Sequence, residues 1–309
     1  MESARRAGVV TRAQALTSGE TIASLRWKVS RGRWQVLWPG VFYVHSGPVP
    51  APAQAWGRLL AAGPGAVLSH ASAAAMWDLA PSPSPAVHVR IPATRRAPVV
   101  PGLQVTRTRQ LAPLVHPTRT PAVTTVEATV VDLASSASRL DEVLAVAGSA
   151  VQRRLTTPAL VAAEAGRRER LRFRKELLLA LDAATSGAHS ALEMHYLHGV
   201  ERAHGLPVGV RQSPARGARG RVFRDVDYRG YGLLVELDGR LGHSDVAGRH
   251  RDMERDNAAA LAAEVTLRFG WSDVLARRCG VASQVVVGLR RGGWSGTPRR
   301  CSRACTMLP

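Results

Sequence analysis

The chain has 309 residues, 45% of them hydrophobic, which is enough for a buried core and for two or three domains. No stretch approaches the ~20 apolar residues of a membrane-spanning helix, and the N-terminus lacks the apolar core of a signal peptide, so we expect a cytoplasmic protein that does not enter a membrane. The net charge is +19, and all but two of the 42 basic residues are arginine. Because arginine pairs with phosphate through two parallel N–H groups, this excess predicts nucleic acid as the partner.

Residues 1–46 combine two predicted helices with a predicted hairpin. The first helix is expected to open at Thr11, and the second covers TIASLRWKVSRGRW, where apolar side chains recur at helical spacing at Ile22, Leu25 and Val29. The stretch RWQVLWPGVFYV alternates in hydrophobicity on both sides of Pro-Gly, which predicts two short strands and a turn. Two helices followed by a hairpin have the outline of a winged helix-turn-helix.

Four basic residues lie close together in this segment, where a winged helix would contact backbone phosphates: Arg26, Lys28, Arg31 and Arg33. They predict a DNA-binding surface. The alternative is a small helical subdomain whose basic face is simply solvated.

Residues 51–182 predict a mixed α+β domain. A Pro- and Ala-rich connector leads into a helix near residues 53–62, strands are expected at AVHVRIP and GLQVTRT, and the remainder is mostly helical. Within LSHASAAAMWDL, the neighbouring Ser69, His70 and Ser72 contain the residue types of a nucleophile and its base. We interpret them as helix-capping or core residues, which is the commoner role of such a group.

The first half of the chain, about residues 5–180, resembles actinobacterial proteins with an abortive-infection AbiEi-type antitoxin domain. The resemblance rests on GVVTRAQAL, GRWQVLWPGVFYV and LSHASAAAMWDL. It implies a winged-helix DNA-binding module followed by a helical and mixed domain, with a cognate toxin as a candidate partner. Whether this chain is an antitoxin does not follow from the resemblance.

Residues 186–294 predict a third domain with the element order α-β-β-β-α-β-α. Side chains alternate along a strand, so Asp225 and Asp227 share one face of VFRDVDY, while Glu236 and Asp238 share one face of YGLLVELDG. If the two strands pair through the intervening turn, three or four carboxylates converge. Clustered carboxylates repel one another unless a cation neutralises them, and oxygen ligands suit Mg²⁺ or Mn²⁺.

This segment resembles the restriction-endonuclease-like PD-(D/E)XK superfamily, specifically the domain related to very-short-patch repair endonucleases. The markers are SALE at 190–193, the run ending VELDGRLGH, RDMERDN and TLRFGW. The resemblance implies a central mixed sheet flanked by helices and metal-dependent cleavage of phosphodiester bonds. It gives the fold class as α/β and α+β multidomain, with an N-terminal winged helix, a middle α+β domain and a C-terminal αβββαβ sandwich.

The resemblance also implies roles for individual residues. Glu236 corresponds to the second-motif acid, and Asp225 to the first-motif acid with Asp227 in reserve. Glu193 corresponds to an acid of the opening helix that could complete a metal shell, and His243 to a base or water-positioning residue. Two further residues, Arg255 and Asp256, could bridge to the site or form an ion pair on a helix surface.

The chain departs from the superfamily pattern at the third motif. Asp238 stands where the pattern has a lysine, so we count it with the catalytic acids, and no lysine follows Lys175. The lysine normally stabilises developing negative charge, a role that Arg240, Arg255 or His243 could fill. An inactive, DNA-holding nuclease fold in a transcriptional regulator therefore stays the alternative. An RNA substrate and the oligomeric state also stay open.

All three cysteines lie near the C-terminus, at Cys279, Cys301 and Cys305, the last two in a basic tail over residues 295–309. Three thiolates and one histidine make a plausible zinc site, and His243 is a candidate fourth ligand. The alternative is free thiols in a frayed tail, since CxxxC spacing alone is weak.

Overall fold

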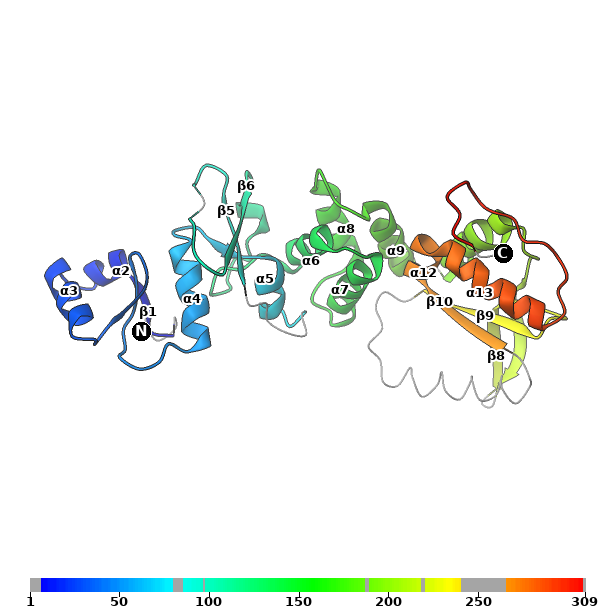
Figure 1. Cartoon of the computed structure of the whole chain (residues 1–309), viewed down its shortest axis with the longest axis horizontal. Helices are drawn as coiled ribbons and strands as arrows, with labels where there is room; N and C mark the ends of the chain where they lie inside the picture. Colours follow the sequence, from blue (N-terminus) through cyan, green and yellow to red (C-terminus); the bar gives the residue numbers. More distant parts are fainter. Residues whose placement is uncertain are drawn as a thin grey trace. The chain divides into compact units, whose positions relative to one another are not determined.

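The computed structural model divides into two compact units, residues 1–133 (the N-terminal unit) and 134–309 (the C-terminal unit) (Figure 1). It describes residues 7–79, 86–96, 98–186, 189–217, 220–239 and 265–307. Helices and strands are mixed in both units, as expected, but the division falls inside the segment 51–182 that we predicted as one domain. None of the helices in these ranges is long and apolar enough to cross a membrane.

The N-terminal unit opens with a three-stranded antiparallel sheet of order β1-β3-β2 and two helices. The elements are β1 (Val9–Thr11), α2 (Arg12–Thr17), α3 (Ile22–Ser30), β2 (Gln35–Trp38) and β3 (Val41–Tyr43). Thr11 caps α2 as predicted, in a capping box with Gln14. The hairpin turns at Gly40, whose φ of +78° suits glycine. The pairing of β1 with β3 adds a strand that the sequence did not predict.

The two helices pack on one face of this sheet through Ala15, Leu25 and Phe42, with Val29 and Trp34 at the edge. The predicted apolar face of α3 is thus only partly right. Ile22 lies at the first turn, beyond the reach of the sheet, and is 55% exposed.

The opposite face of the sheet packs on α4 (Ala51–Ala61), so the segment 1–46 shares a core with the helix that follows it. The rest of the unit is a second sheet of order β4-β5-β6 with short helices. Its elements are β4 (Val67–Leu68), α5 (His70–Met76), β5 (Val87–Pro92), β6 (Leu103–Thr108) and the 3₁₀ helix η1 (Ala112–Leu114). Both predicted strands are confirmed, and they pair in parallel.

Helices begin the C-terminal unit. They are the end of α6 (Val126–Ser136), α7 (Leu140–Gln152), α8 (Pro158–Arg167) and α9 (Arg174–Ser186). Thr157 caps α8, whose first residue is the proline favoured at that position. The mostly helical character predicted for the later part of residues 51–182 is confirmed by these helices.

The C-terminal unit ends in a four-stranded sheet of order β10-β9-β8-β7, with helices on one face (Figure 1). The elements are α10 (His189–Tyr196), the π-helix η2 (Leu197–Arg202), β7 (Val210–Gly217), β8 (Gly220–Tyr228), β9 (Leu233–Asp238), β10 (Val265–Gly270), α12 (Trp271–Ala276) and α13 (Arg278–Arg291). Gly288 of α13 lies directly against Leu233, where a Cβ atom would stand 2.8 Å from the leucine. The helix predicted between β9 and β10 lies outside the described residues.

Candidate acidic site on the C-terminal sheet

Strands β8 and β9 form an antiparallel pair whose register brings two of the predicted acids opposite each other. Val226 pairs with Val235, and Tyr228 with Leu233. The next position along the same register puts Asp225 opposite Glu236, just beyond the last ladder pair. The connection is the predicted tight turn, in which Gly230 has a φ of +86°.

The two faces of this strand pair differ in character. Val226, Tyr228, Val235 and Leu237 are at most 3% exposed and face the helical layer. Because side chains alternate, all four acids of β8 and β9 project from the opposite face. The predicted separation of acids from hydrocarbon is therefore confirmed, although Leu234 is also buried on the acidic face.

Asp225 lies on β8, between the neighbouring strands β7 and β9. Its Oδ2 accepts a hydrogen bond from the backbone N–H of Leu237 at 2.7 Å, in place of a strand carbonyl. On its other side, Gln212 of β7 has a φ of +50°, and the β7–β8 pairing skips this residue. A left-handed residue other than glycine is strained and occurs preferentially at functional sites.

Glu236 has a partner that the sequence did not suggest. Strand β10 pairs with β9 in parallel, Arg268 lies beside Glu236, and Arg268 Nε donates to Glu236 Oε2 at 3.0 Å. The two side chains are 32% and 26% exposed, so this ion pair remains accessible to solvent. The only signal in the sequence was the arginine within VTLRFG, which becomes informative once the strand register is known.

The remaining predicted acids are held separately. Gln212 Nε2 donates to Glu193 Oε1 at 2.6 Å, which ties α10 to the strained position of β7. Asp227 accepts from the Ser213 hydroxyl at 2.9 Å and lies 3.6 Å from the Arg229 guanidinium, which favours a structural role. Asp238 ends β9, opposite Gly270 of β10.

Comparison of the sequence with models of protein families and with curated proteins found no match. The resemblances to the AbiEi-type and nuclease-like groups therefore stay proposals.

Among the described residues, the acids do not gather three or more ligand atoms at one point, and the group that does is His204, Cys279, Cys301 and Cys305. The predicted contributors His243, Arg240, Arg255 and Asp256 lie outside the described ranges.

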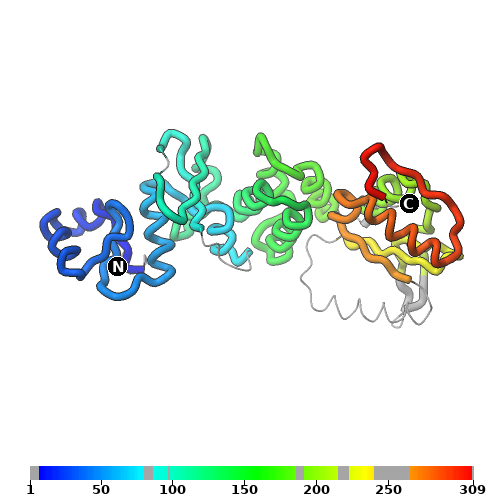
Figure 2. The backbone as a smooth tube through the Cα atoms, in the orientation of Figure 1, coloured from blue at the N-terminus to red at the C-terminus, as the bar shows by residue number. Residues whose placement is uncertain are grey.

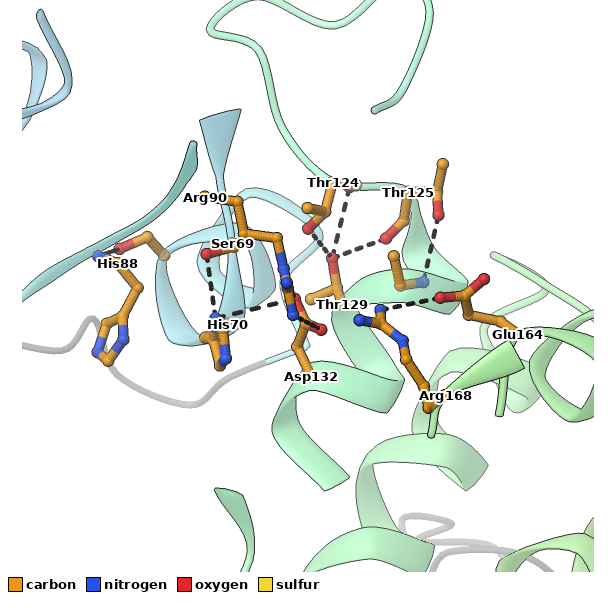
Figure 3. A network of polar contacts seen from close by, with 12 residues as sticks. Ser69, His70, His88, Arg90, Thr124, Thr125, Thr129, Asp132, Glu164 and Arg168 are labelled. Carbon is orange, nitrogen blue, oxygen red and sulfur yellow. Dashed lines mark hydrogen bonds and ion pairs between the residues drawn. The ribbon is translucent and has the colours of Figure 1, made fainter. Parts of the chain in front are cut away.

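Ser69, His70 and Asp132 lie together in the N-terminal unit, but they do not have the geometry of a hydrolytic triad (Figure 3). His70 Nδ1 is 3.0 Å from the Ser69 hydroxyl and 3.8 Å from Asp132 Oδ2, whereas a triad uses opposite nitrogens of the ring. Arg90 pairs with both carboxylate oxygens of Asp132. Ser69 is fully buried and caps no helix through its side chain, so the expected core role is confirmed for this residue.

The predicted DNA-binding residues differ in availability. Arg26, Arg31 and Arg33 are exposed, and the Arg33 guanidinium stacks 4.8 Å from the ring centre of Trp27, which is 47% exposed. Lys28 instead forms an ion pair with Glu20 and lies over Trp34. The basic surface therefore consists mainly of three arginines, Arg26 within α3 and Arg31 and Arg33 just after its end.

Proposed function

We propose that this chain is a DNA-binding, metal-dependent endonuclease-like protein, whose N-terminal module binds DNA and whose C-terminal sheet carries the acidic site. The single observation that carries the proposal is the register that puts Asp225 opposite Glu236 on the polar face of a sheet whose other face is packed. Two carboxylates in facing positions repel each other, and a bound cation would relieve this repulsion.

The residues present fit a divalent cation. Asp225 and Glu236 offer carboxylate oxygens from adjacent strands, and Glu193 reaches the same region through Gln212. When bound, Mg²⁺ or Mn²⁺ supplies a Lewis acid that neutralises charge on a phosphodiester. Arg268 orients the Glu236 carboxylate, and its guanidinium brings a positive charge beside that carboxylate.

The exposed arginines of α3 and of the turn that follows it supply the electrostatic attraction to DNA. Arg26, Arg31 and Arg33 carry charges that can displace counterions from the phosphate backbone. The flat, exposed ring of Trp27 next to Arg33 adds a surface suited to a sugar or base face.

A cleavage assay tests the proposal. The full-length protein should nick supercoiled plasmid with Mg²⁺ or Mn²⁺ and not with EDTA. Asp225→Asn and Glu236→Gln should abolish nicking, while the charge-matched control Glu169→Gln, at an exposed position of the same unit, should cut like the wild type. Wild-type protein that binds DNA yet leaves single- and double-stranded substrates intact with both metals would contradict the proposal.

A second candidate function is favoured by the Glu236–Arg268 ion pair. The arginine already neutralises the acid, and the superfamily lysine is missing, which is the chemistry expected of an inactive nuclease fold. The chain would then be a DNA-binding regulator or antitoxin of the abortive-infection type with a cognate toxin as partner. This function predicts binding to the promoter of its own gene with an affinity that Glu236→Gln does not change.

A further inference from the structure

The segment after α13 folds back onto the end of η2 (Figure 2). The backbone N–H of Arg299 donates to the carbonyl of His204 at 2.8 Å, and its guanidinium donates to the carbonyl of Arg202 at 2.6 Å. Cys305 and Met307 are each 5% exposed. The expectation of a frayed tail is therefore wrong for residues 299–307, because this segment satisfies the carbonyl groups at the end of a helix.

This return brings all three cysteines of the chain to one histidine. The three Sγ atoms and a ring nitrogen of His204 lie within 4.8 Å of one another. Cys279 Sγ is 3.6 Å from Cys301 Sγ and 3.6 Å from Cys305 Sγ. A tetrahedral zinc ion with Zn–S bonds of about 2.3 Å requires sulfur atoms about 3.8 Å apart, so the spacing matches that of zinc ligands.

His204 is arranged as a metal ligand. The imidazole is fully buried, and its Nδ1 lies 2.9 Å from the carbonyl oxygen of Val200, so Nδ1 carries the proton and donates it. Nε2 then bears the lone pair, and it is buried without a hydrogen-bond partner among the described residues. A buried acceptor without a partner is destabilising, and metal-binding histidines commonly donate their second nitrogen to a carbonyl in this way.

Other uses of the three thiols fit less well. A disulfide between Cys279 and Cys301 would leave Cys305 unpaired and buried. An iron–sulfur cluster needs several irons between its ligands, whereas four ligand atoms within 4.8 Å enclose room for a single ion. Soft sulfur ligands in a compact tetrahedral set select zinc among the common divalent metals.

We propose that His204, Cys279, Cys301 and Cys305 form a structural Zn²⁺ site that fastens the C-terminal segment to η2 and α13. Each cysteine binds as a thiolate, so the ion and its ligands carry a net charge of −1. Four arginines are close to these ligands in the sequence, so the site lies in a positively charged segment: Arg278, Arg299, Arg300 and Arg303. Protein atoms fill all four coordination positions of the ion, which is typical of a structural rather than a catalytic site.

Metal analysis of the wild-type chain is the first test. Protein purified without chelator should contain about one zinc per chain, and exchange with Co²⁺ should give thiolate-to-cobalt charge transfer together with the visible absorption of tetrahedral Co²⁺. A folded chain that binds no Co²⁺ through thiolates overturns the proposal, as does a native disulfide between any two of the cysteines.

Variants separate the ligands from their surroundings. Cys301→Ser should remove about a third of the charge-transfer intensity, and His204→Asn should shift the visible band. His198→Asn, on the same helical segment but exposed, should leave the spectrum unchanged. Glu236→Gln should also leave it unchanged, which keeps this test independent of the acidic site.

Proteolysis reports what the ion does for the fold. Trypsin can cut after the exposed Arg299, Arg300 and Arg303. Removal of zinc by a chelator should release this segment and speed these cuts at least tenfold, and added Zn²⁺ should restore protection. Equal cutting rates with and without zinc would mean that the ion does not hold the segment, and would overturn the structural role.

Discussion

Arg268 and Glu236 occupy directly paired positions of parallel strands β10 and β9, with Arg268 Nε 3.0 Å from Glu236 Oε2. The nuclease-like pattern expects a lysine at position 238, which pairs with Gly270, two residues further along the same strands. Under the proposed nuclease function, Arg268 would supply from the neighbouring strand the positive charge that the absent lysine would otherwise bring. The same contact would also suit a fold that has lost catalysis, and activity measurements on Arg268 distinguish the two.

Replacing Arg268 should affect cleavage far more than stability. Arg268→Ala is expected to slow plasmid nicking by ~10–100-fold, because the carboxylate of Glu236 loses the partner that orients it. The loss in free energy of unfolding should stay below about 1 kcal/mol, since exposed ion pairs contribute little. Arg277→Ala, which removes an exposed arginine paired with Asp273, is the control and should cut normally. Faster nicking by Arg268→Ala would show instead that the arginine blocks the site.

The basic surface formed by Arg26, Arg31 and Arg33 predicts how the affinity for DNA depends on salt concentration. Each of Arg26→Ala, Arg31→Ala and Arg33→Ala should weaken DNA binding and lower the slope of log affinity against log salt by about 0.9, since each removes one phosphate contact. Lys28→Ala should change the slope less, because Glu20 already neutralises Lys28. Fluorescence anisotropy with labelled duplex at several salt concentrations measures both quantities. An unchanged slope in the triple arginine variant would place the DNA-binding surface elsewhere.

Local signals in the sequence identified most of the elements. Thr11 predicted the start of α2 because a helix cap is a local signal, and the Pro-Gly turn predicted the hairpin of β2 and β3. The alternation of acids and apolar residues likewise separated the two faces of β8 and β9. Strand β1 was missed because its only partner, β3, is distant in the sequence, so three residues showed no pattern of their own.

The site residues that were missed share a different cause. Arg268 and His204 are ordinary in their own segments, and they become meaningful only through a strand register and a returning tail that no short window contains. His243, the candidate fourth zinc ligand, lies outside the described residues, and within the described residues His204 lies beside the cysteines. Which residues distant in the sequence share one site depends on the tertiary structure, and the hydrophobic periodicity of a short segment contains no information about it.

The buried pair of Arg90 and Asp132 should be important for the stability of the N-terminal unit. Asp132 is 1% exposed and accepts two hydrogen bonds from the Arg90 guanidinium. Asp132→Ala should lower the free energy of unfolding by about 3–5 kcal/mol, because it leaves a buried charge without its partner. Urea unfolding measures this loss. The double variant Arg90→Met, Asp132→Leu should recover much of it, and a double variant as unstable as the single one would contradict the desolvation argument.

A second buried network lies in the C-terminal unit, around Glu201. This fully buried carboxylate accepts from the Arg211 guanidinium, with the shorter contact at 2.6 Å, and from the Tyr228 hydroxyl at 2.7 Å. Since Tyr228 donates to Glu201, the Tyr196 hydroxyl must donate to Tyr228 across their 2.9 Å contact. Burial, more than any neighbouring charge, raises the pKa of both Tyr196 and Tyr228.

This network predicts a loss of stability at high pH. The phenols of Tyr196 and Tyr228 stay protonated in the folded state, whereas in the unfolded chain they ionise near pH 10, so unfolding releases protons and its free energy falls as pH rises above about 10. The slope reaches about 1.4 kcal/mol per pH unit for each phenol. The double variant Tyr196→Phe, Tyr228→Phe should be less stable at neutral pH by about 1–3 kcal/mol, because Glu201 loses a donor, yet it should lose less stability between pH 10 and 11. Urea unfolding across this range, with Tyr231→Phe as the control, tests the sign: a double variant as pH-sensitive as the wild type would show that these two phenols do not remain protonated in the folded chain.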